Sequence, residues 1–306
     1  MSQGLTRIAV AAAPLNPLDL LIASGTFHSA RHELPYVPGS ECVGQVVDSD
    51  CFALGSWVYA EFSATPSSPG PFADEAVALN ASVLQLPADV NPVQAAAVGN
   101  SGTAAFMPLV DHAAMRPGET VIVLGATGVV GQLAVQIARL RGAGAVIAVG
   151  RDRSVLERLP DLGADAVVEL RTDESAGDLA DRLLGVAGPA NVVLDGIYGL
   201  PFEAALLACA PHARLVNVGN LAGPTSQVPA GLLRGKQLTI TGFAGLHTPL
   251  ADKERALTWL WRALADDKLQ IGITTWPLEH LPMAWSAQAA SPHNKYVVLP
   301  QELSRS

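Results

Sequence analysis

A short apolar segment, residues 121–124, is followed at once by a glycine-rich turn and then by a segment with helical periodicity. Residues 121–124 are apolar or β-branched throughout, which is typical of a strand buried on both faces. After the turn, apolar residues recur at helical spacing from Val130 to Ala138. A strand, a glycine turn and a helix in this order predict the βα unit that binds dinucleotides.

The glycines of the turn have separable roles. We expect Gly125 and Gly128 to let the backbone turn tightly and approach a pyrophosphate, and Gly131 to let the helix lie close to the strand. The helix N-terminus then offers free N–H groups and a partial positive charge to phosphates. Alanine replaces the first glycine of G-x-G-x-x-G, because the motif starts at Ala126. The alternative is a glycine-rich turn that binds no ligand.

The end of the second apolar strand, residues 145–149, indicates which dinucleotide binds. About 20 residues after the last glycine, an acidic side chain would hold the ribose 2′-OH of NAD. The sequence there is Gly150, Arg151, Asp152 and Arg153. Because a guanidinium forms bidentate hydrogen bonds with a 2′-phosphate, NADPH is favoured over NADH. The alternative is that Asp152 binds the ribose while Arg151 stacks on adenine or lies in solvent.

Composition narrows the class of protein. The 306 residues are 49% hydrophobic, which is enough for a large core and two domains. No apolar run reaches about 18 residues and no basic, hydrophobic leader is present, so we expect a cytoplasmic protein without a membrane span. The net charge of −9 disfavours nucleic-acid binding. Cys42, Cys51 and Cys209 lack metal-like spacing and are expected to be ordinary buried thiols.

Short strands separated by proline and glycine turns precede residue 92, which predicts a β-rich domain. A helical segment then leads into alternating strands and helices, which predicts a doubly wound parallel sheet. The six strands are expected at residues 121–124, 145–149, 166–169, 192–195, 215–218 and 238–243. Residues 224–233, between the last two strands, have the composition of a loop. A helix at 252–266 and a strand, helix and strand within 271–299 are expected to return to the first domain.

Further motifs cover nearly the whole chain: Asn16-Pro17-x-Asp19, VPGSExxG at 37–44, FADE at 72–75, PGE at 117–119, LGAD at 162–165 and KxVVL at 295–299. With the glycine turn, they resemble the medium-chain dehydrogenase/reductase superfamily, in its zinc-free, quinone oxidoreductase-like branch. The resemblance implies an α/β fold, with a GroES-like catalytic domain at 1–93 and 247–306 and a Rossmann NADPH-binding domain at 94–246. It also implies a cleft between the domains and a homodimer formed through residues 238–243.

Zinc ligands of the zinc-dependent branch correspond to Asn16, Ser40 and about Gly99, none of which is a good ligand. We therefore expect no metal site. Without a Lewis acid, the expected chemistry is hydride transfer from NADPH to a small hydrophobic quinone or α,β-unsaturated carbonyl compound. A zinc alcohol dehydrogenase is the alternative that metal analysis would reveal.

The resemblance implies cofactor-binding residues at the turn, at the strand ends and in the catalytic domain. They are Asn16, Thr103, Gly125, Ala126, Thr127, Gly128, Val129, Val130, Gly131, Gly150, Arg151, Arg153, Asp195, Gly196, Val218, Gly219, Asn220, Phe243, Ala244, Gly245 and Lys295. For Lys295, the alternative is a surface lysine that opens the last strand.

No catalytic acid is assigned, and Asn16 is only a weak catalytic candidate. Quinone-reducing relatives often have tyrosines where this chain has Leu21 and Phe27. Further possible neighbours of the substrate are Tyr36, Tyr198, His28 and His247, each of which is more often structural or on the surface.

Two other functions remain open: an enoyl-thioester reductase, and an NADPH-binding sensor or partner protein with little catalysis. By this resemblance the chain also starts within what is normally the second strand of the family's first domain. Two alternatives stay open: the start is misplaced, or the domain has lost an edge strand, which would open the cleft or weaken the domain.

Overall fold

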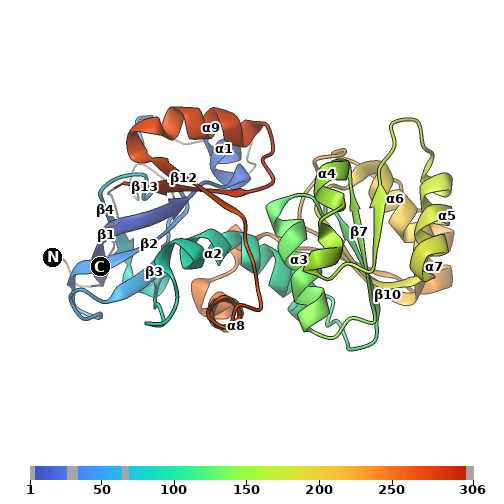
Figure 1. Cartoon of the computed structure of the whole chain (residues 1–306), viewed down its shortest axis with the longest axis horizontal. Coiled ribbons are helices and arrows are strands. Elements are labelled where there is room, and N and C mark those ends of the chain that lie inside the picture. The colour runs from blue at the N-terminus through green and yellow to red at the C-terminus, as the bar shows by residue number, and fades with distance from the viewer. Residues whose placement is uncertain (1–3, 26–33, 64–68, 301–306) are drawn as a thin grey trace. The chain divides into compact units, whose positions relative to one another are not determined.

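The computed structural model describes residues 4–25, 34–63 and 69–300, and its chain divides into two compact units (Figure 1). Unit 1 comprises Met1–Ser101 and Leu246–Ser306, and unit 2 comprises Gly102–Gly245. Two segments from opposite ends of the chain therefore build unit 1. Over the described ranges, no helix is long and apolar enough to cross a membrane.

Unit 2 contains a six-stranded, fully parallel sheet with the strand order β11-β10-β9-β6-β7-β8. The strands are β6 (Thr120–Leu124), β7 (Ala145–Gly150), β8 (Ala166–Glu169), β9 (Ala190–Asp195), β10 (Cys209–Asn217) and β11 (Thr239–Gly242). The chain winds outward from β6 in one direction through β7 and β8, and in the other through β9, β10 and β11. The predicted doubly wound sheet is therefore confirmed.

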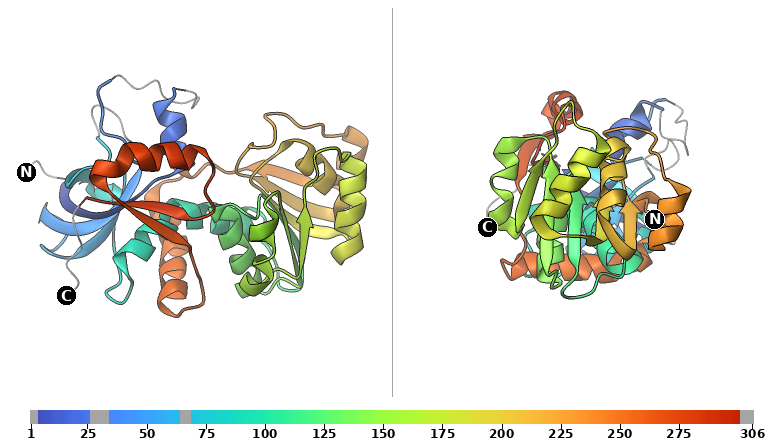
Figure 2. Two further views of the ribbon diagram at one scale, coloured as in Figure 1. Left: turned by 45° about the horizontal axis from the view of Figure 1, so that its top comes forward. Right: turned by 90° about the vertical axis from the view of Figure 1, so that its right-hand side faces the viewer.

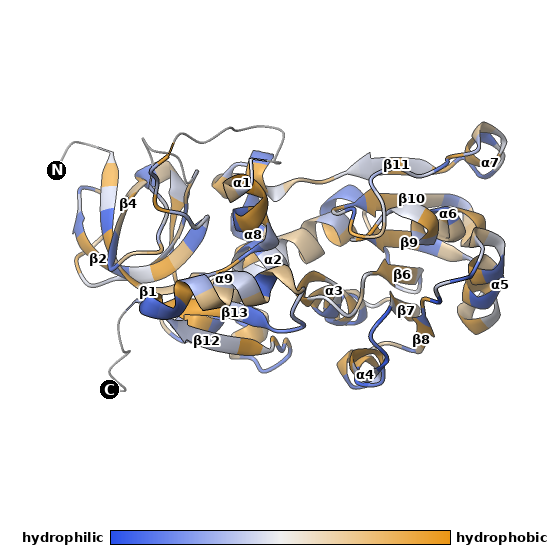
Figure 3. Cartoon of the chain, turned by 90° about the horizontal axis from the view of Figure 1, so that it is seen from above, coloured by the Kyte–Doolittle hydropathy of each residue, from blue (hydrophilic) through white to orange (hydrophobic). Residues whose placement is uncertain are grey.

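Helices cover both faces of this sheet. Figure 1 shows α3 (Val129–Leu140) and α4 (Arg153–Leu156) on one face, with α5 (Ala176–Ala187), α6 (Gly199–Ala208) and α7 (Ala230–Lys236) on the other. In Figure 3, α4 and α5 are hydrophobic along one side and hydrophilic along the other. α4 and α5 therefore each bury an apolar stripe against the strands.

Residues 224–229 form a loop, as expected, but α7 begins at Ala230, so the expectation of no clear helix between the last two strands is wrong. Leu232 and Leu233 pack against the core of unit 2, and Lys236 Nζ donates to the carbonyl oxygens of Leu207 and Cys209, each at 2.7 Å. Two glycines in a helix of seven residues lower its intrinsic propensity. Tertiary contacts stabilise a helix that the local sequence does not indicate.

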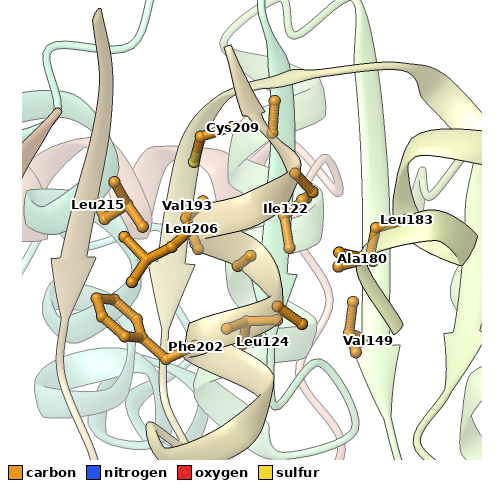
Figure 4. Close-up of a cluster of buried hydrophobic side chains, with 14 of the residues drawn as sticks. Ile122, Leu124, Val149, Ala180, Leu183, Val193, Phe202, Leu206, Cys209 and Leu215 are labelled. Atoms are coloured by element: carbon orange, nitrogen blue, oxygen red, sulfur yellow. The ribbon is translucent and has the colours of Figure 1, made fainter. Parts of the chain in front are cut away.

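The core of unit 2 joins α5 and α6 to the strands (Figure 4). Phe202 and Leu206 of α6 lie beside Val193 of β9 and Leu215 of β10, and all four are at most 1% exposed. Complete burial of such side chains contributes about 1.5–3 kcal/mol each. This packing holds the carboxyl ends of the parallel strands at one edge of the sheet.

Unit 1 is a seven-stranded, mainly antiparallel sheet ordered β12-β13-β1-β2-β3-β5, with β4 paired to β1. Its strands are β1 (Leu5–Pro14), β2 (Glu41–Ser49), β3 (Trp57–Glu61), β4 (Glu75–Leu79), β5 (Val83–Gln85), β12 (Ile273–Pro277) and β13 (Lys295–Leu299). The return of the C-terminal segment is confirmed by β13, which pairs with β1. The three-residue β5 was not expected, because it is too short to show a pattern.

The described part of unit 1 also contains four α-helices. They are α1 (Pro17–Ala23), α2 (Pro92–Met107), α8 (Leu250–Ala265) and α9 (Leu281–Ala289). Figure 2 shows α9 beside the β12–β13 pair. α2 contains the boundary between the units and continues as a π-helix at Pro108–His112.

The three cysteines are free thiols. Cys42 and Cys209 are buried, as expected, but the expectation of burial is wrong for Cys51. This residue lies in the connection between β2 and β3, where the chain turns at the surface.

Candidate functional site

The glycine turn after β6 forms a close backbone contact. Gly125 has φ +82°, and a Cβ atom there would lie 2.9 Å from Ile197 Cγ2. A Cβ atom on Gly131 would lie 2.3 Å from the carbonyl oxygen of Gly125 and 2.5 Å from Ala126 Cα. Both positions therefore require glycine, the first for the turn and the second for the approach of α3 to β6.

The backbone at Gly128 does not form the tight turn that the sequence predicts. Its φ of −77° is accessible to every residue type, and a Cβ atom there would lie no closer than 3.6 Å to the carbonyl oxygen of Gly125. Gly128 is the N-cap of α3 and supplies no side chain to the first N–H groups of the helix. Those N–H groups have no intrahelical acceptor, so they remain available to an anion.

The end of β7 has no acidic residue aimed at a ribose. A Cβ atom on Gly150 would lie 2.6 Å from Thr127 Cγ2, so the close approach of the glycine turn excludes a side chain there. Asp152 is the N-cap of α4, and its Oδ1 accepts from Val155 N at 3.2 Å and from Ser154 Oγ at 2.6 Å. Asp152 therefore has a structural task, which weakens its case as the ribose ligand.

The two arginines that flank Asp152 differ in their partners. Arg153 Nε donates to Glu157 Oε1 at 3.0 Å, one helical turn along. Arg151 is exposed and forms no hydrogen bond or ion pair with any residue that the structure describes. Arg151 is therefore the guanidinium at this strand end whose donors are free for an anion.

The ends of β9 and β10 approach each other closely. A Cβ atom on Gly219 would lie 2.5 Å from the carbonyl oxygen of Gly196. Asp195 is fully buried and accepts from Tyr198 N at 2.8 Å and from Asn217 Nδ2 at 2.7 Å. Burial raises the pKa of Asp195, and these hydrogen bonds oppose the rise. Its carboxylate fixes the turn, so only the backbone at Gly196 is left for a ligand.

The remaining candidates fall in different places. Thr103 is fully buried in α2, and Phe243 is 9% exposed, with its ring 5.3 Å from that of His112. His247 is exposed. Phe27 and His28 lie outside the described residues.

Unit 1 holds a second group of candidate residues, which we call the polar cluster. It consists of Asn16, Asp19, Ser40, Glu41, Tyr59, Glu61, Asn100, Ser101, Lys253 and Lys295. Most of these side chains are buried, although the sheet around them is apolar. Buried polar groups at this density require mutual hydrogen bonds.

Asn16, directly after β1, lies at the centre of the polar cluster. Its Nδ2 donates to Glu41 Oε1 at 2.9 Å and to Ser40 Oγ at 3.2 Å. Its Oδ1 accepts from Lys295 Nζ, which also donates to Ser101 Oγ at 3.0 Å. Lys295 is 3% exposed, so the alternative of a surface lysine is wrong.

The cluster extends from Glu41 toward α8. Glu41 Oε2 accepts from Tyr59 OH at 2.7 Å and from Asn100 N at 2.7 Å. Tyr59 OH is also 3.2 Å from Glu61 Oε1, and Lys253 Nζ donates to both oxygens of Glu61 at 2.9 and 2.8 Å. A continuous set of contacts therefore links Lys295 to Lys253.

Burial perturbs several of these groups. It raises the pKa of Asp19 to about 7, against the hydrogen bond from Asn16 N, the Ser40 hydroxyl and the charge of Lys295. Burial lowers the pKa of Lys295, and the charges of Glu41 and Asp19 oppose this. Shifts of this kind accompany functional sites as well as structural ion pairs.

The positions that correspond to zinc ligands do not fit a metal ion. Asn16 and Ser40 are hydrogen-bonded to each other, and Asn16 Oδ1 already faces the ammonium of Lys295. Gly99 has no side chain, and a Cβ atom there would lie 2.2 Å from Glu41 Oε2. Within the described ranges, no group of three or more His, Cys, Asp or Glu residues could hold a metal. This donor set suits a cationic side chain better than zinc.

Sequence reasoning did not single out five members of the polar cluster: Tyr59, Glu61, Asn100, Ser101 and Lys253. Their only signal is polarity at positions that turn out to be buried, and burial is not visible in one sequence. Glu61 and Tyr59 stand two residues apart on β3, so one strand face carries both toward Glu41.

Two families of dehydrogenase domains match successive parts of the chain. Residues 2–88 match the alcohol dehydrogenase GroES-like domain, and residues 129–262 match the zinc-binding dehydrogenase family. A quinone oxidoreductase-like protein 2 homolog from Nematostella vectensis is 29% identical over 79% of this chain and 66% of its own length. Mouse mitochondrial enoyl-[acyl-carrier-protein] reductase is 32% identical over 82% of this chain and 69% of its own length.

A mycobacterial protein solved in complex with NADPH has a TM-score of 0.83 and 25% identity, over 97% of this chain and 92% of that one. The chain spans about two thirds of the length of the curated relatives it matches. The sheet topology, both family matches and these relatives all support the same superfamily. The chain belongs to the medium-chain dehydrogenase/reductase superfamily, in its quinone oxidoreductase-like branch.

Proposed function

We propose that this chain transfers hydride from NADPH to a small hydrophobic quinone or α,β-unsaturated carbonyl compound without a metal ion. The relatives support an NADPH-dependent oxidoreductase. The acceptor and the metal-free chemistry are what we propose beyond this.

The observation that carries the proposal is the replacement of a metal-binding donor set by the polar cluster. Oxidising an unactivated alcohol requires a Lewis acid to stabilise the alkoxide. A quinone or an enone is already electrophilic, so a positioned hydride donor and a hydrogen-bond donor to the oxygen suffice. Lys295, whose ammonium is anchored on Asn16 Oδ1 and Ser101 Oγ, supplies such a hydrogen-bond donor in unit 1.

The choice of NADPH rests on the end of β7 in unit 2. Arg151 has free donors, whereas Asp152 caps α4 and Gly150 has no room for a side chain. A free guanidinium at this position suits the 2′-phosphate. The first turn of α3 supplies N–H groups for the pyrophosphate.

The test is a fluorescence titration with NADPH and NADH, followed by addition of 1,4-benzoquinone or 2-cyclohexenone. We expect preferential NADPH binding and its oxidation after the acceptor is added. Arg151→Ala should weaken NADPH binding about 10-fold or more, the cost of a lost charge-assisted contact, and leave NADH binding within about twofold. Arg158→Ala, a change at another exposed arginine in unit 2, is the matched control.

Equal affinity for NADH and NADPH would contradict the role of Arg151. Tight NADPH binding without turnover over a broad panel of acceptors would favour a sensor or partner protein. Zinc at one equivalent per chain by elemental analysis, with activity lost to a chelator, would contradict the metal-free part of the proposal.

A second candidate is an enoyl-thioester reductase, which the 32% identity to the mouse enzyme favours. An enoyl thioester is itself an α,β-unsaturated carbonyl compound, so the same hydride chemistry applies. Turnover of crotonyl-CoA at a kcat/KM at least about 10-fold above that of quinones and simple enones would favour this candidate, because that ratio corresponds to recognition of the carrier.

A further inference from the structure

The ammonium group of Lys295 is buried but incompletely hydrogen-bonded. It has three N–H donors, and only Asn16 Oδ1 and Ser101 Oγ accept from it among the residues whose positions are described. The side chain is 3% exposed, so bulk water does not accept a hydrogen bond from the remaining N–H. A buried donor without an acceptor is costly and indicates a missing partner.

A complementary acceptor lies in the same cluster. Asp19 is 2% exposed, and its Oδ1 has no hydrogen-bond partner in the described part of the chain. Its Oδ2 accepts from the backbone N–H of Asn16 at 2.7 Å. Asn16 thus contacts both incomplete groups, Lys295 through its side chain and Asp19 through its backbone.

The rest of the cluster fixes the direction of the Asn16 amide. Glu41 accepts hydrogen bonds and Lys295 only donates them, so Nδ2 must face Glu41 and Oδ1 must face Lys295. Tyr59 and the N–H of Asn100 hold Glu41 in turn. The ammonium is therefore held in one place, as preorganised electrostatic stabilisation requires.

We propose that Lys295 binds the carbonyl oxygen of the substrate through its third N–H and stabilises the negative charge that develops there. This inference rests on the reduction proposed above. In effect, a fixed ammonium lies against Asn16, one of the positions that correspond to zinc ligands in the zinc-dependent branch.

The chemical step balances without a further reactant. Bound NADPH would supply the hydride that forms the C–H bond at the electrophilic carbon and would be oxidised to NADP⁺. The π electrons would move to the oxygen, and Lys295 would stabilise the oxyanion. Water supplies the proton that gives the hydroquinone or enol, whose new O–H can donate to Asp19 Oδ1.

The first test uses binding and no turnover. The probe is 4-nitrophenol, whose phenolate absorbs visible light, titrated with pH in the presence of wild-type protein and NADP⁺. We expect bound 4-nitrophenol to ionise at least about one pH unit below the free compound, because a nearby cation favours the phenolate. Lys295→Met should abolish this shift, and Lys295→Arg should retain part of it. The absence of a shift in the wild type would overturn the inference.

The second test separates the oxyanion role from binding of cofactor phosphate. For Lys295→Met we expect kcat to fall about 10²–10³-fold, as for loss of an oxyanion donor, with the Kd for NADPH within about twofold. Lys268→Met, at an exposed lysine of unit 1, should leave both unchanged. A raised Kd for NADPH with unchanged kcat would overturn the inference and make Lys295 a phosphate ligand.

Two further outcomes are distinguishable. If none of the acceptors tested supports oxidation of NADPH by the wild type, the proposed function fails. The 4-nitrophenol shift then still decides whether Lys295 stabilises an oxyanion. If Lys295→Met does not fold by circular dichroism, Ser101→Ala removes one anchor of the ammonium and keeps its charge. That variant should lower kcat by about 10-fold and reduce the phenolate shift, and no change in either would count against the inference.

Discussion

The nucleotide-binding end of unit 2 and the polar cluster of unit 1 are built in opposite ways. The first is made of backbone: glycines that come close to other chain segments, and helix N–H groups without a capping side chain. The second is made of side chains from separate segments, most of them buried and each hydrogen-bonded to another member. Added atoms should therefore damage the first, and removed partners should damage the second.

The largest effect is expected from the buried ion pair of the polar cluster. Lys253→Met leaves the carboxylate of Glu61, whose side chain is 21% exposed, without its cationic partner, so the free energy of unfolding of unit 1 should fall by about 3–5 kcal/mol. Lys268→Met removes an ion pair of similar length from the surface and should cost less than about 1 kcal/mol.

Intrinsic tryptophan fluorescence measures this effect in unit 1 alone, because every tryptophan lies there. The five are Trp57, Trp259, Trp261, Trp276 and Trp285. Urea unfolding curves followed by this signal should separate the two lysine variants. Similar midpoints for both would show that burial does not distinguish the polar cluster from the surface.

The next effect is a dependence on pH. The pKa of Asp19 rises from 3.8 to about 7 on folding, so the folded state holds its proton more tightly than the unfolded state. The contribution of Asp19 to stability is complete below about pH 4 and is lost as pH rises through 7, by about 2–4 kcal/mol. Above about pH 8 the loss is constant.

Asp19→Asn should remove this dependence. The difference in unfolding free energy between variant and wild type should grow from pH 4 to pH 8 in favour of the variant. Asp266→Asn, at an exposed aspartate of unit 1, should show a constant difference. A flat curve for Asp19→Asn would contradict a raised pKa in the folded protein.

In unit 2, added atoms provide the corresponding test. Gly131→Ala places a Cβ atom 2.3 Å from the carbonyl oxygen of Gly125 and should destabilise unit 2 by about 1–3 kcal/mol. Gly128→Ala meets nothing closer than 3.6 Å and should change stability by less than about 0.5 kcal/mol. Thermal melts by far-ultraviolet circular dichroism measure both.

The Gly128→Ala variant also tests whether the first turn of α3 binds the cofactor. If the first turn of α3 holds the pyrophosphate, a methyl group on Gly128 should weaken NADPH binding without loss of stability. Unchanged affinity in the Gly128→Ala variant would move the phosphate site away from this turn.

The contrast between the two regions also explains which structural features could be predicted from the sequence. Six strands of unit 2 and the roles of Gly125 and Gly131 follow from patterns within a few residues, because a βα turn is a local structure. α7 was not predicted because Gly231 and Gly235 lower the helix propensity of the segment. The helix is stabilised instead by the hydrogen bonds of Lys236 with Leu207 and Cys209, which the local sequence does not indicate.

The polar cluster could not be found in the same way. Glu61 and Lys253 are 192 residues apart, and Asn16 and Lys295 are 279 residues apart. No periodicity connects such positions, and a lysine that is buried looks the same in a sequence as one in solvent. Asn16, Ser40 and Lys295 were singled out only through a family resemblance, which said nothing of their mutual contacts.

The smallest effect concerns backbone strain at Tyr198, after β9. Its φ of +55° and ψ of −155° lie in a region occupied almost only by glycine, which costs about 1–3 kcal/mol. The hydrogen bond from its N–H to Asp195 and the ring contact with Phe202, at 4.8 Å between centroids, hold it there. Because Tyr198→Ala and Tyr198→Gly both remove the ring, they differ only in backbone freedom.

At this position glycine should therefore be more stable than alanine by about 1 kcal/mol, since only glycine relieves the strain. The opposite order is expected within α5, where Gly185→Ala meets no atom within 4 Å and should stabilise by about 0.5–1 kcal/mol. Thermal melts of the four proteins test both signs. If Tyr198→Ala were as stable as Tyr198→Gly, the turn after β9 would not be strained, and Asp195 would not be holding it in this conformation.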